Sequence, residues 1–292
     1  MKKKPKYPIY VISKGRSDRC LTANFLVKDK VPFKLVVEPQ EADLYINKYG
    51  KENVYILPFK NLGQGSIPAR NWVWEHSTKN GYERHWILDD NINGVLRTYK
   101  GKRISCRSLQ AFLACEDFTD RYENIAISGL NYSMFVMGDN QPFYLNVHVY
   151  SFMLIRNDLS FRWRGKYNED TDLCLRALSH NWCTILINVF CCQKIATMTM
   201  KGGNTEELYK EDGRLKMANS LKRMWPHIVD VKRKYKRPQH IVKSSWRIFK
   251  TPLIRKKNIK IPNKPNEYGL KLIQKNPIKS KRLKKLVKDY NA

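Results

Sequence analysis

The sequence predicts an α/β protein in which a mostly parallel sheet is flanked by helices and followed by a basic C-terminal extension. Short apolar runs alternate with helical patterns through the first two-thirds of the 292-residue chain, which is typical of strands joined by crossover helices. Basic residues crowd into the last fifth, where prolines also interrupt regular structure. These observations predict a folded domain, residues 1–231, and an extension, residues 232–292.

Strands and helices are expected in alternation along the first domain. Each predicted strand is an apolar run, and these runs cover residues 9–12, 34–37, 54–57, 85–88 and 125–128. Helical patterns fill the intervals at residues 19–27, 41–48, 66–77 and 108–122. A second group has strands at residues 143–155 and 183–190 around a helix at 169–180, and a closing helix is expected at 281–288. Ligands of such sheets bind beyond the carboxyl ends of the strands.

Composition limits the cellular setting. The basic start, residues 1–6, leads into Tyr7 without an apolar signal segment, and no later run approaches the roughly 18 apolar residues of a membrane span. Seven cysteines are odd in number and lack C-x-x-C spacing, which argues against a disulfide framework or a zinc knuckle. We expect a soluble, unexported protein with reduced thiols.

The formal net charge of +29 indicates a polyanionic partner such as nucleic acid. Residues 232–292 hold 21 lysines and arginines against two acidic residues, a local charge of +19. Aromatic residues such as Trp246 and Phe249 are interspersed and could stack on bases. A solvated, disordered tail is the alternative interpretation of such a composition.

The strand at residues 85–88 ends in Asp89-Asp90-Asn91. Hard oxygen ligands at a strand tip are suited to a divalent cation, and such a cation implies a phosphorylated substrate. The same tripeptide is also common in turns, where short polar side chains bond their own backbone. The tripeptide alone leaves both interpretations open.

A second motif, residues 63–71, precedes that strand. Its glycines, including Gly65, free the backbone to turn, Ser66 can cap a helix, and Pro68 suits a first helical turn. Arg70 and Asn71 then lie near a helix start, where anions are favoured. The segment is either a nucleotide-phosphate site or an ordinary capped helix.

A third motif lies at residues 161–172. Asn168 can cap a helix whose first turn holds Glu169, Asp170 and Asp172, and negative charge is stabilised there by the helix dipole. Capping is therefore one interpretation, and acid–base chemistry is the other. Arg162, Arg164 and Lys166 could compensate phosphate charge nearby.

The order of these motifs resembles the GT-A (Rossmann-like) class of nucleotide-sugar glycosyltransferases. In that class the Arg-Asn helix lies beside the nucleotide, and the acidic strand tip holds Mn²⁺ or Mg²⁺. Together with residues 12–16, Ile-Ser-Lys-Gly-Arg, and residues 166–173, the set resembles the TET/JBP-associated glycosyltransferases of bacteriophages, from about Pro8 to Thr205. Members of that family are understood to attach sugars to 5-hydroxymethylcytosine in phage DNA after a TET-type oxygenase has made the hydroxyl.

The resemblance implies roles for particular residues. Asp170 is expected to be the catalytic base, with Glu169 as the second candidate. The metal ligands are expected to be Asp89, Asp90 and Asn91, although Asn91 departs from the aspartate of the usual motif. The UDP-sugar is expected to contact Ser13, Arg16, Glu38, Gly65, Arg70, Asn71, Asp89 and Arg164. The loop at residues 201–205 could close over the diphosphate.

The expected partners are double-stranded DNA containing 5-hydroxymethylcytosine and a nucleotide sugar, with a TET-type oxygenase acting upstream. We expect no membrane association, a monomer, and a location in the cytoplasm of the infected bacterial host. Two alternatives remain. A Mg²⁺-dependent nuclease would gather metal on Asp89, Asp90 and Glu169, and a non-catalytic DNA-binding protein would use only its charge.

Overall fold

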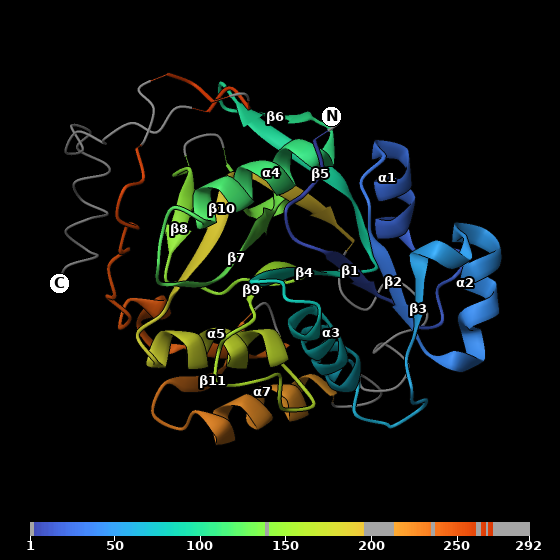
Figure 1. The fold of residues 1–292 in the computed structure, drawn as a ribbon. Coiled ribbons are helices and arrows are strands. Elements are labelled where there is room, and N and C mark those ends of the chain that lie inside the picture. The colour runs from blue at the N-terminus through green and yellow to red at the C-terminus, as the bar shows by residue number, and fades with distance from the viewer. Residues whose placement is uncertain are drawn as a thin grey trace. The chain divides into compact units, whose positions relative to one another are not determined.

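A ten-stranded sheet forms the centre of the fold (Figure 1). The computed structural model describes residues 3–137, 140–195, 213–234, 237–260, 264–266 and 268–270. Along the sheet the order is β3 (Val54–Ile56), β2 (Lys34–Val37), β1 (Ile9–Ile12), β4 (Arg84–Asp89), β9 (Phe152–Arg156), β7 (Ile125–Tyr132), β10 (Cys183–Lys194), β5 (Ile92–Tyr99) and β6 (Lys102–Ser105), while β8 (Phe143–Leu145) also pairs with β10.

Strand direction places several strand ends at one edge. The pairs β2–β3, β1–β2, β1–β4 and β7–β10 are parallel, and β9 runs antiparallel between β4 and β7. The strands β1, β2, β4, β7 and β10 therefore point the same way, and their carboxyl ends share an edge with the start of β9. The predicted α/β class is confirmed, and the sheet is mixed at β9, β5 and β8.

Helices cover both faces of the sheet. The helices are α1 (Leu21–Asp29), α2 (Ala42–Tyr49), α3 (Ile67–Lys79), α4 (Ser108–Thr119), α5 (Glu169–Ser179) and α7 (Gly213–Met224). Short 3-10 turns occupy Pro39–Glu41, Lys51–Asn53, Ser133–Phe135 and Lys243–Trp246. Figure 1 shows α4 on one side of the sheet and α3 and α5 on the other. The core between the sheet and α3 and α5 includes the buried side chains of Tyr10, Trp74, Ile87 and Leu173.

The strand expected at residues 143–155 is interrupted. The chain forms β8 and β9, and between them Asn146 and Ser151 adopt left-handed φ angles of 55° and 58°. Residues with positive φ cannot continue an extended strand, so the chain turns there. The sequence prediction also missed the hairpin of β5 and β6, in which Lys100 and Gly101 have positive φ, as a tight hairpin turn requires.

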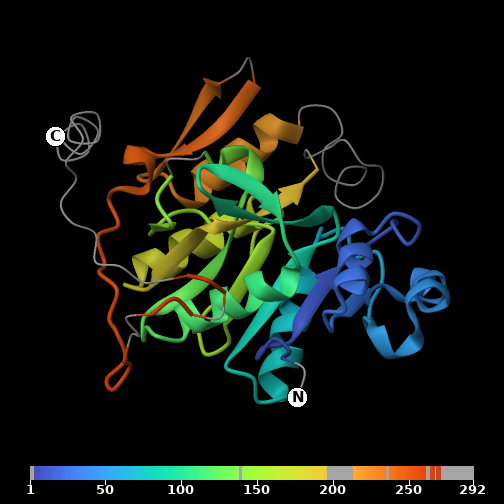
Figure 2. The same ribbon diagram turned by 90° about the horizontal axis from the view of Figure 1, so that it is seen from above.

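The segment after α7 is a second small structure. The strands β11 (Val229–Lys234) and β12 (Arg237–Val242) form an antiparallel pair, drawn in orange in Figure 2. Pro238 is tolerated because a two-stranded sheet has only edge strands. Val229 and Val242 form a buried cluster with Leu175 and Leu221, so apolar residues attach this hairpin to α5 and α7.

Contacts between residues divide the chain into Met1–Lys256 and Lys257–Ala292. The sequence placed a boundary between residues 231 and 232, whereas residues 232–256 lie within the first compact unit. The apolar side chains of Val242, Trp246 and Phe249 account for this, because they pack in the clusters around α5 and α7. The expected helix at 281–288 and the loop at 201–205 lie outside the described residues.

The described helices and the cysteines were checked against the sequence expectations in turn. In the described part of the chain, no helix is long and apolar enough to cross a membrane. All seven cysteines carry free thiols, and six of them are buried. Burial raises the pKa of thiols such as Cys174, which favours the unreactive protonated form.

Candidate active site

Polar side chains from several elements meet at the edge where the parallel strands end. Asp89 ends β4 and Lys194 ends β10, while Ser151 directly precedes β9. Asp170 lies in the first turn of α5. The sheet topology thus brings together residues that lie up to 105 positions apart in the sequence.

Asp89 is held by two cations. Its Oδ1 accepts a hydrogen bond from Arg70 Nη2 at 2.9 Å, and its Oδ2 accepts from Lys194 Nζ at 2.6 Å and from Ser151 Oγ at 2.7 Å. Burial alone would raise the pKa of Asp89, but Lys194 and Arg70 outweigh it and lower that pKa to about 2. Asp89 is therefore ionised at neutral pH.

Asp90 faces a different group of residues. Ser13 Oγ donates to Asp90 Oδ2 at 2.7 Å, and Arg16 Nη1 lies 2.5 Å from Asp90 Oδ1. Ser13, Arg16 and Asp90 are all buried, and Ser13 also bonds the hydroxyl of Tyr45. Burial raises the pKa of Asp90 in spite of Arg16. Ser13 and Arg16, expected to contact the donor, therefore bind the second carboxylate of the motif and tie the loop after β1 to it.

The trio Asp89-Asp90-Asn91 was expected to bind a divalent cation. Asp89 already carries two ion pairs, and Asp90 carries one. Asn91 Oδ1 is buried and, among the described residues, has no hydrogen-bond partner. Within the described residues, no group of three or more His, Cys, Asp or Glu is arranged to hold a metal ion. The oxygens of Asp89, Asp90 and Asn91, with these partners, do not fit a divalent cation. Hydrogen bonds and ion pairs do not test metal binding directly, so the role of these residues as metal ligands stays a prediction.

Arg70 connects the start of α3 to the start of α5. Arg70 Nε donates to Ser66 Oγ at 3.0 Å and lies 3.4 Å from Glu169 Oε1, which accepts from Ser66 Oγ at 3.0 Å. Ser66 is the N-cap residue of α3, as expected, but its side chain makes no cap bond and is taken up by Arg70 and Glu169 instead. The guanidinium of Arg70 also lies 4.7 Å from the ring centre of Trp163. These contacts fix Arg70 beside two carboxylates, Asp89 and Glu169.

The two acidic residues at the start of α5, Glu169 and Asp170, have pKa values shifted in opposite directions by their surroundings. Asp170 Oδ1 accepts from the backbone N–H of Thr171 at 2.7 Å, and Oδ2 lies 3.3 Å from His148 Nε2. Burial would raise the pKa of Asp170, but His148 and Arg70 lower it well below its usual range. Burial raises the pKa of Glu169, with Asp170 adding to the rise. Of the two carboxyl groups, Glu169 takes up a proton first and Asp170 stays ionised.

Comparison with known sequences shows the family to which the chain belongs. A sequence profile described as TET-Associated Glycosyltransferase matches residues 7–203, which is more than half of the chain. The chain belongs to this family. It is therefore a glycosyltransferase, as the sequence motifs indicated. No functionally characterised relative was found at a significant level of similarity.

A search of solved structures gave a distant likeness. One match is a nucleotide-diphospho-sugar transferase candidate from Desulfovibrio desulfuricans G20, with 12% identity and a TM-score of 0.36. The match covers 63% of this chain and 80% of the other. A TM-score this low does not support the fold assignment, which rests on the strand order described above.

A row of rings lies beside Asp170 in the glycosyltransferase. The ring centres of Tyr132 and Tyr150 are 4.3 Å apart, and those of Tyr150 and His148 are 4.9 Å apart. Trp246, from the expected DNA-binding extension, stacks on His148 at 5.7 Å and 9°. This aromatic row, Tyr132, Tyr150, His148 and Trp246, connects the acidic pair to the C-terminal part of the compact unit.

The other residues that were expected to contact the UDP-sugar form hydrogen bonds within the protein that hold loops in place. Glu38 accepts bonds from the Lys14 and Gln40 side chains and from the backbone of Asn61. Asn71 bonds both the N–H and the C=O of Trp163, each at 3.0 Å. Arg164 makes a bidentate pair with buried Asp172 at 2.9 and 3.0 Å.

Gly65 and Asn168 lie just before two helices of the site, α3 and α5. Gly65, in the turn before α3, has φ +63°, which glycine adopts without steric cost. Asn168 is the N-cap residue of α5, as expected, but its side chain makes no cap bond and instead donates to the carbonyl of Met217 in α7.

Sequence reasoning missed three site residues. His148 and Ser151 lie in the interrupted segment between β8 and β9, which was predicted as one strand. Lys194 lies four residues beyond the predicted end of its strand. A signal was present in each case, because Asn146 and Ser151 break an apolar run and Lys194 is a charge at a strand tip.

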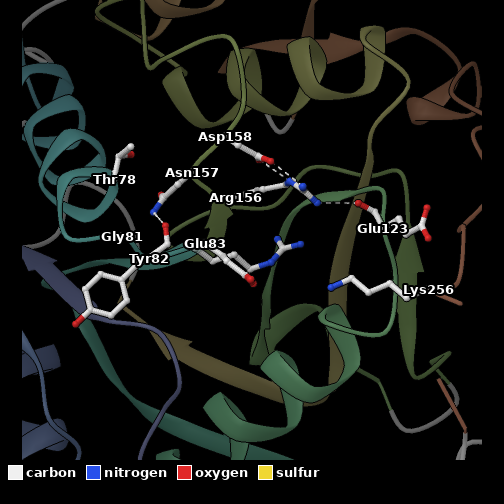
Figure 3. A pocket seen from close by; sticks show the side chains of 10 residues that line it. Thr78, Gly81, Tyr82, Glu83, Glu123, Arg156, Asn157, Asp158 and Lys256 are labelled. Atoms are coloured by element: carbon white, nitrogen blue, oxygen red, sulfur yellow. Dashed lines mark hydrogen bonds and ion pairs between the residues drawn. The ribbon is translucent and has the colours of Figure 1, made fainter. Parts of the chain in front are cut away.

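A pocket of about 500 Å³ lies at the opposite end of β4 (Figure 3). Its lining includes Arg84, the first residue of β4, and Arg156, which donates to Asp158 and to the carbonyl of Glu123. It contains none of the expected site residues. Because ligands of such sheets bind beyond the carboxyl ends of the strands, we assign this pocket no role in transfer.

Proposed function

We propose that this glycosyltransferase moves a sugar from a UDP-sugar to the hydroxymethyl oxygen of 5-hydroxymethylcytosine in double-stranded DNA. The observation that carries the proposal is the Asp170 carboxylate, which His148 and the backbone of Thr171 hold at the start of α5. It belongs to the strand-end edge at which Arg70 and Lys194 contact Asp89, in a member of the TET-associated family. A TET-type oxygenase supplies the hydroxyl on which the reaction depends.

The donor is proposed to lie over the carboxyl ends of β1 and β4, where open α/β sheets bind nucleotides. Arg70 and Lys194 are the cations at that position, and both contact Asp89. Positive charge there favours a diphosphate group and its departure from the sugar. The fixed contacts of Arg70 with Ser66 and Glu169 keep the cation oriented before the donor arrives.

The acceptor is proposed to lie against Asp170. The carboxylate of Asp170 accepts the proton of the hydroxymethyl group. At the same time the hydroxymethyl oxygen bonds to the sugar's anomeric carbon, and the bond between that carbon and the diphosphate breaks. His148 orients Asp170 through the contact to Oδ2. Asp170 is about a quarter exposed, so a substrate hydroxyl can approach it.

DNA binding is proposed for residues 232–292 together with the aromatic row. The extension carries a local charge of +19, and Trp246 brings one of its rings to His148. The 5-position of cytosine faces the major groove, but a hydroxyl that must reach a partly buried carboxylate requires the base to leave the stack. The aromatic row offers a stacking surface for such a base.

Sugar transfer can be measured on the nucleosides themselves. A duplex with 5-hydroxymethylcytosine and a matched duplex with cytosine are incubated with the protein and with UDP-sugars, digested, and analysed by mass spectrometry. We expect a hexose mass on 5-hydroxymethyl-2′-deoxycytidine alone. Absence of any adduct with all common nucleotide sugars contradicts the proposal, and nicking of a plasmid under Mg²⁺ would favour the nuclease alternative.

A further inference from the structure

Lys194 occupies the position at which the family resemblance implied a divalent cation. We propose that Lys194, assisted by Arg70, supplies the positive charge for the leaving diphosphate, so that this glycosyltransferase works without a bound metal ion. The inference rests on the proposed function, since it concerns the donor of that reaction.

The fold directs Lys194 to this place. The register of β10 against β5 shifts between Cys192 and Lys194, and Lys194 is paired with Ile92, which follows the Asp89-Asp90-Asn91 turn. Such irregularities commonly re-aim a side chain beside an active site. The Lys194 side chain is only 9% exposed, and its Nζ binds Asp89 and Ser151 at 2.6 and 2.7 Å. An ammonium group has three donors, and the hydrogen bonds to described residues use two of them, which leaves one for a phosphate oxygen.

The neighbours of Lys194 hold it rigidly. Ser151 donates its only proton to Asp89 Oδ2, so the hydroxyl of Tyr132, 2.6 Å away, donates to Ser151. The ring of Tyr132 also lies 5.6 Å from Lys194 Nζ. A lysine fixed in this way is prepared for the transition state without reorganisation, which is how preorganised charges act most effectively.

Charge argues against a metal ion on the same carboxylate. An ion bound to Asp89 Oδ2 at about 2.1 Å would lie within roughly 5 Å of Lys194 Nζ, because Nζ is 2.6 Å from that oxygen. Binding through Oδ1 would place the ion equally near Arg70, whose Nη2 is 2.9 Å away. Either position sets a divalent cation beside a fixed positive charge, which repels it.

Asp90 offers no substitute ligand. Its carboxylate is buried and occupied by Arg16 and Ser13. Of the three residues in the motif, only Asn91 then offers an oxygen without a partner among the described residues. One carboxamide is a weak site for Mg²⁺ or Mn²⁺, which prefer several charged oxygen ligands.

Calorimetric titration with UDP tests the inference directly. Wild-type protein is titrated in EDTA and again with Mn²⁺, and the nucleoside assay is run under the same two conditions. We expect the UDP dissociation constant and the transfer rate to agree within about threefold. In EDTA, Lys194→Met should bind UDP about ten to a hundred times more weakly, as expected for loss of a charged hydrogen bond, whereas Lys194→Arg should stay within a few-fold of wild type.

Lys222→Met is the matched control, because Lys222 forms a 2.7 Å ion pair with Asp230 away from the strand-end cluster. We expect it to bind UDP like the wild type. Binding and transfer by the wild type that are lost in EDTA and restored by Mn²⁺ would overturn the inference while leaving the proposed function intact. An absence of UDP binding under both conditions would contradict the proposed donor, and the inference with it.

Discussion

Neighbouring carboxylates in this site differ because their surroundings differ. Asp89 and Asp170 have lowered pKa values because cations or a histidine outweigh their burial, whereas burial prevails at Asp90 and Glu169. Carboxyl groups whose pKa values are pushed apart in this way often divide acid and base roles between them. The ionised Asp170 is accordingly the base in the proposed reaction.

His148 should act as a positioning residue for Asp170. Replacing it, His148→Ala, removes the group that holds the pKa of Asp170 down. That pKa then rises, so the acidic limb of the kcat/KM profile moves to higher pH, and kcat at neutral pH falls about tenfold. His180→Ala is the control, since His180 is exposed at the end of α5. A uniform loss of rate with an unmoved acidic limb would show that His148 serves only packing.

Residues that belong to local patterns were predictable from the sequence. Asp89, Arg70 and the Glu169-Asp170 pair each follow a strand end or open a helix, and the structure brings all of them together. The partners His148, Ser151 and Lys194 were not predicted. Their positions depend on a strand break and a register shift, which arise from pairing between distant strands rather than from local sequence.

At the scale of elements, the break between β8 and β9 creates the acceptor side of the site. It releases His148 and Tyr150 from the sheet, and the 3-10 turn Lys243–Trp246 then places Trp246 on His148. A segment assigned by its charge to a DNA-binding extension is thus also part of the site. The C-terminal boundary at Lys256 follows from this packing.

Trp246 should contribute to DNA binding through its ring. In the variant Trp246→Ala we expect the dissociation constant for hydroxymethylated duplex to rise about tenfold, because stacking on one base contributes about 1–3 kcal/mol. Fluorescence anisotropy gives the affinity, and Tyr99→Ala, which removes an exposed ring on β5, is the control. Equal affinities for the wild type and both variants would show that Trp246 does not contribute to DNA binding.

Most helices and parallel strands were predicted to within a few residues. Their apolar runs are continuous and their start signals are local, as at Ser108 and Glu169. The β5–β6 and β11–β12 hairpins were missed. β6 and β11 carry several charged residues, and β5 and β12 have few buried positions, so these strands lack a clear apolar pattern.

For the molecule as a whole, a large share of the basic residues lies in a different part of the sequence from the residues of the strand-end site. Residues 257–292 hold 11 of the 55 lysines and arginines and form the second contact unit. Counterion release makes DNA affinity depend on salt in proportion to the phosphates contacted.

Removal of residues 257–292 should therefore flatten the salt dependence of DNA binding. We expect the slope of log K against log salt to become shallower by at least about 3, which corresponds to three or more lost phosphate contacts. Affinity measured between low and moderate salt for the full chain and the shortened chain gives both slopes. Identical slopes would locate the phosphate contacts within Met1–Lys256.

The central claim is that the edge around Asp89 and Asp170 transfers sugar to hydroxymethylated DNA. The most direct measurement is the nucleoside mass spectrum after incubation of this DNA and UDP-sugar with wild-type protein and with Asp170→Asn. We expect a hexose adduct with the wild type and at least a hundredfold less with the variant, while DNA binding is retained. Equal adduct from both proteins, or none from either, would contradict this claim.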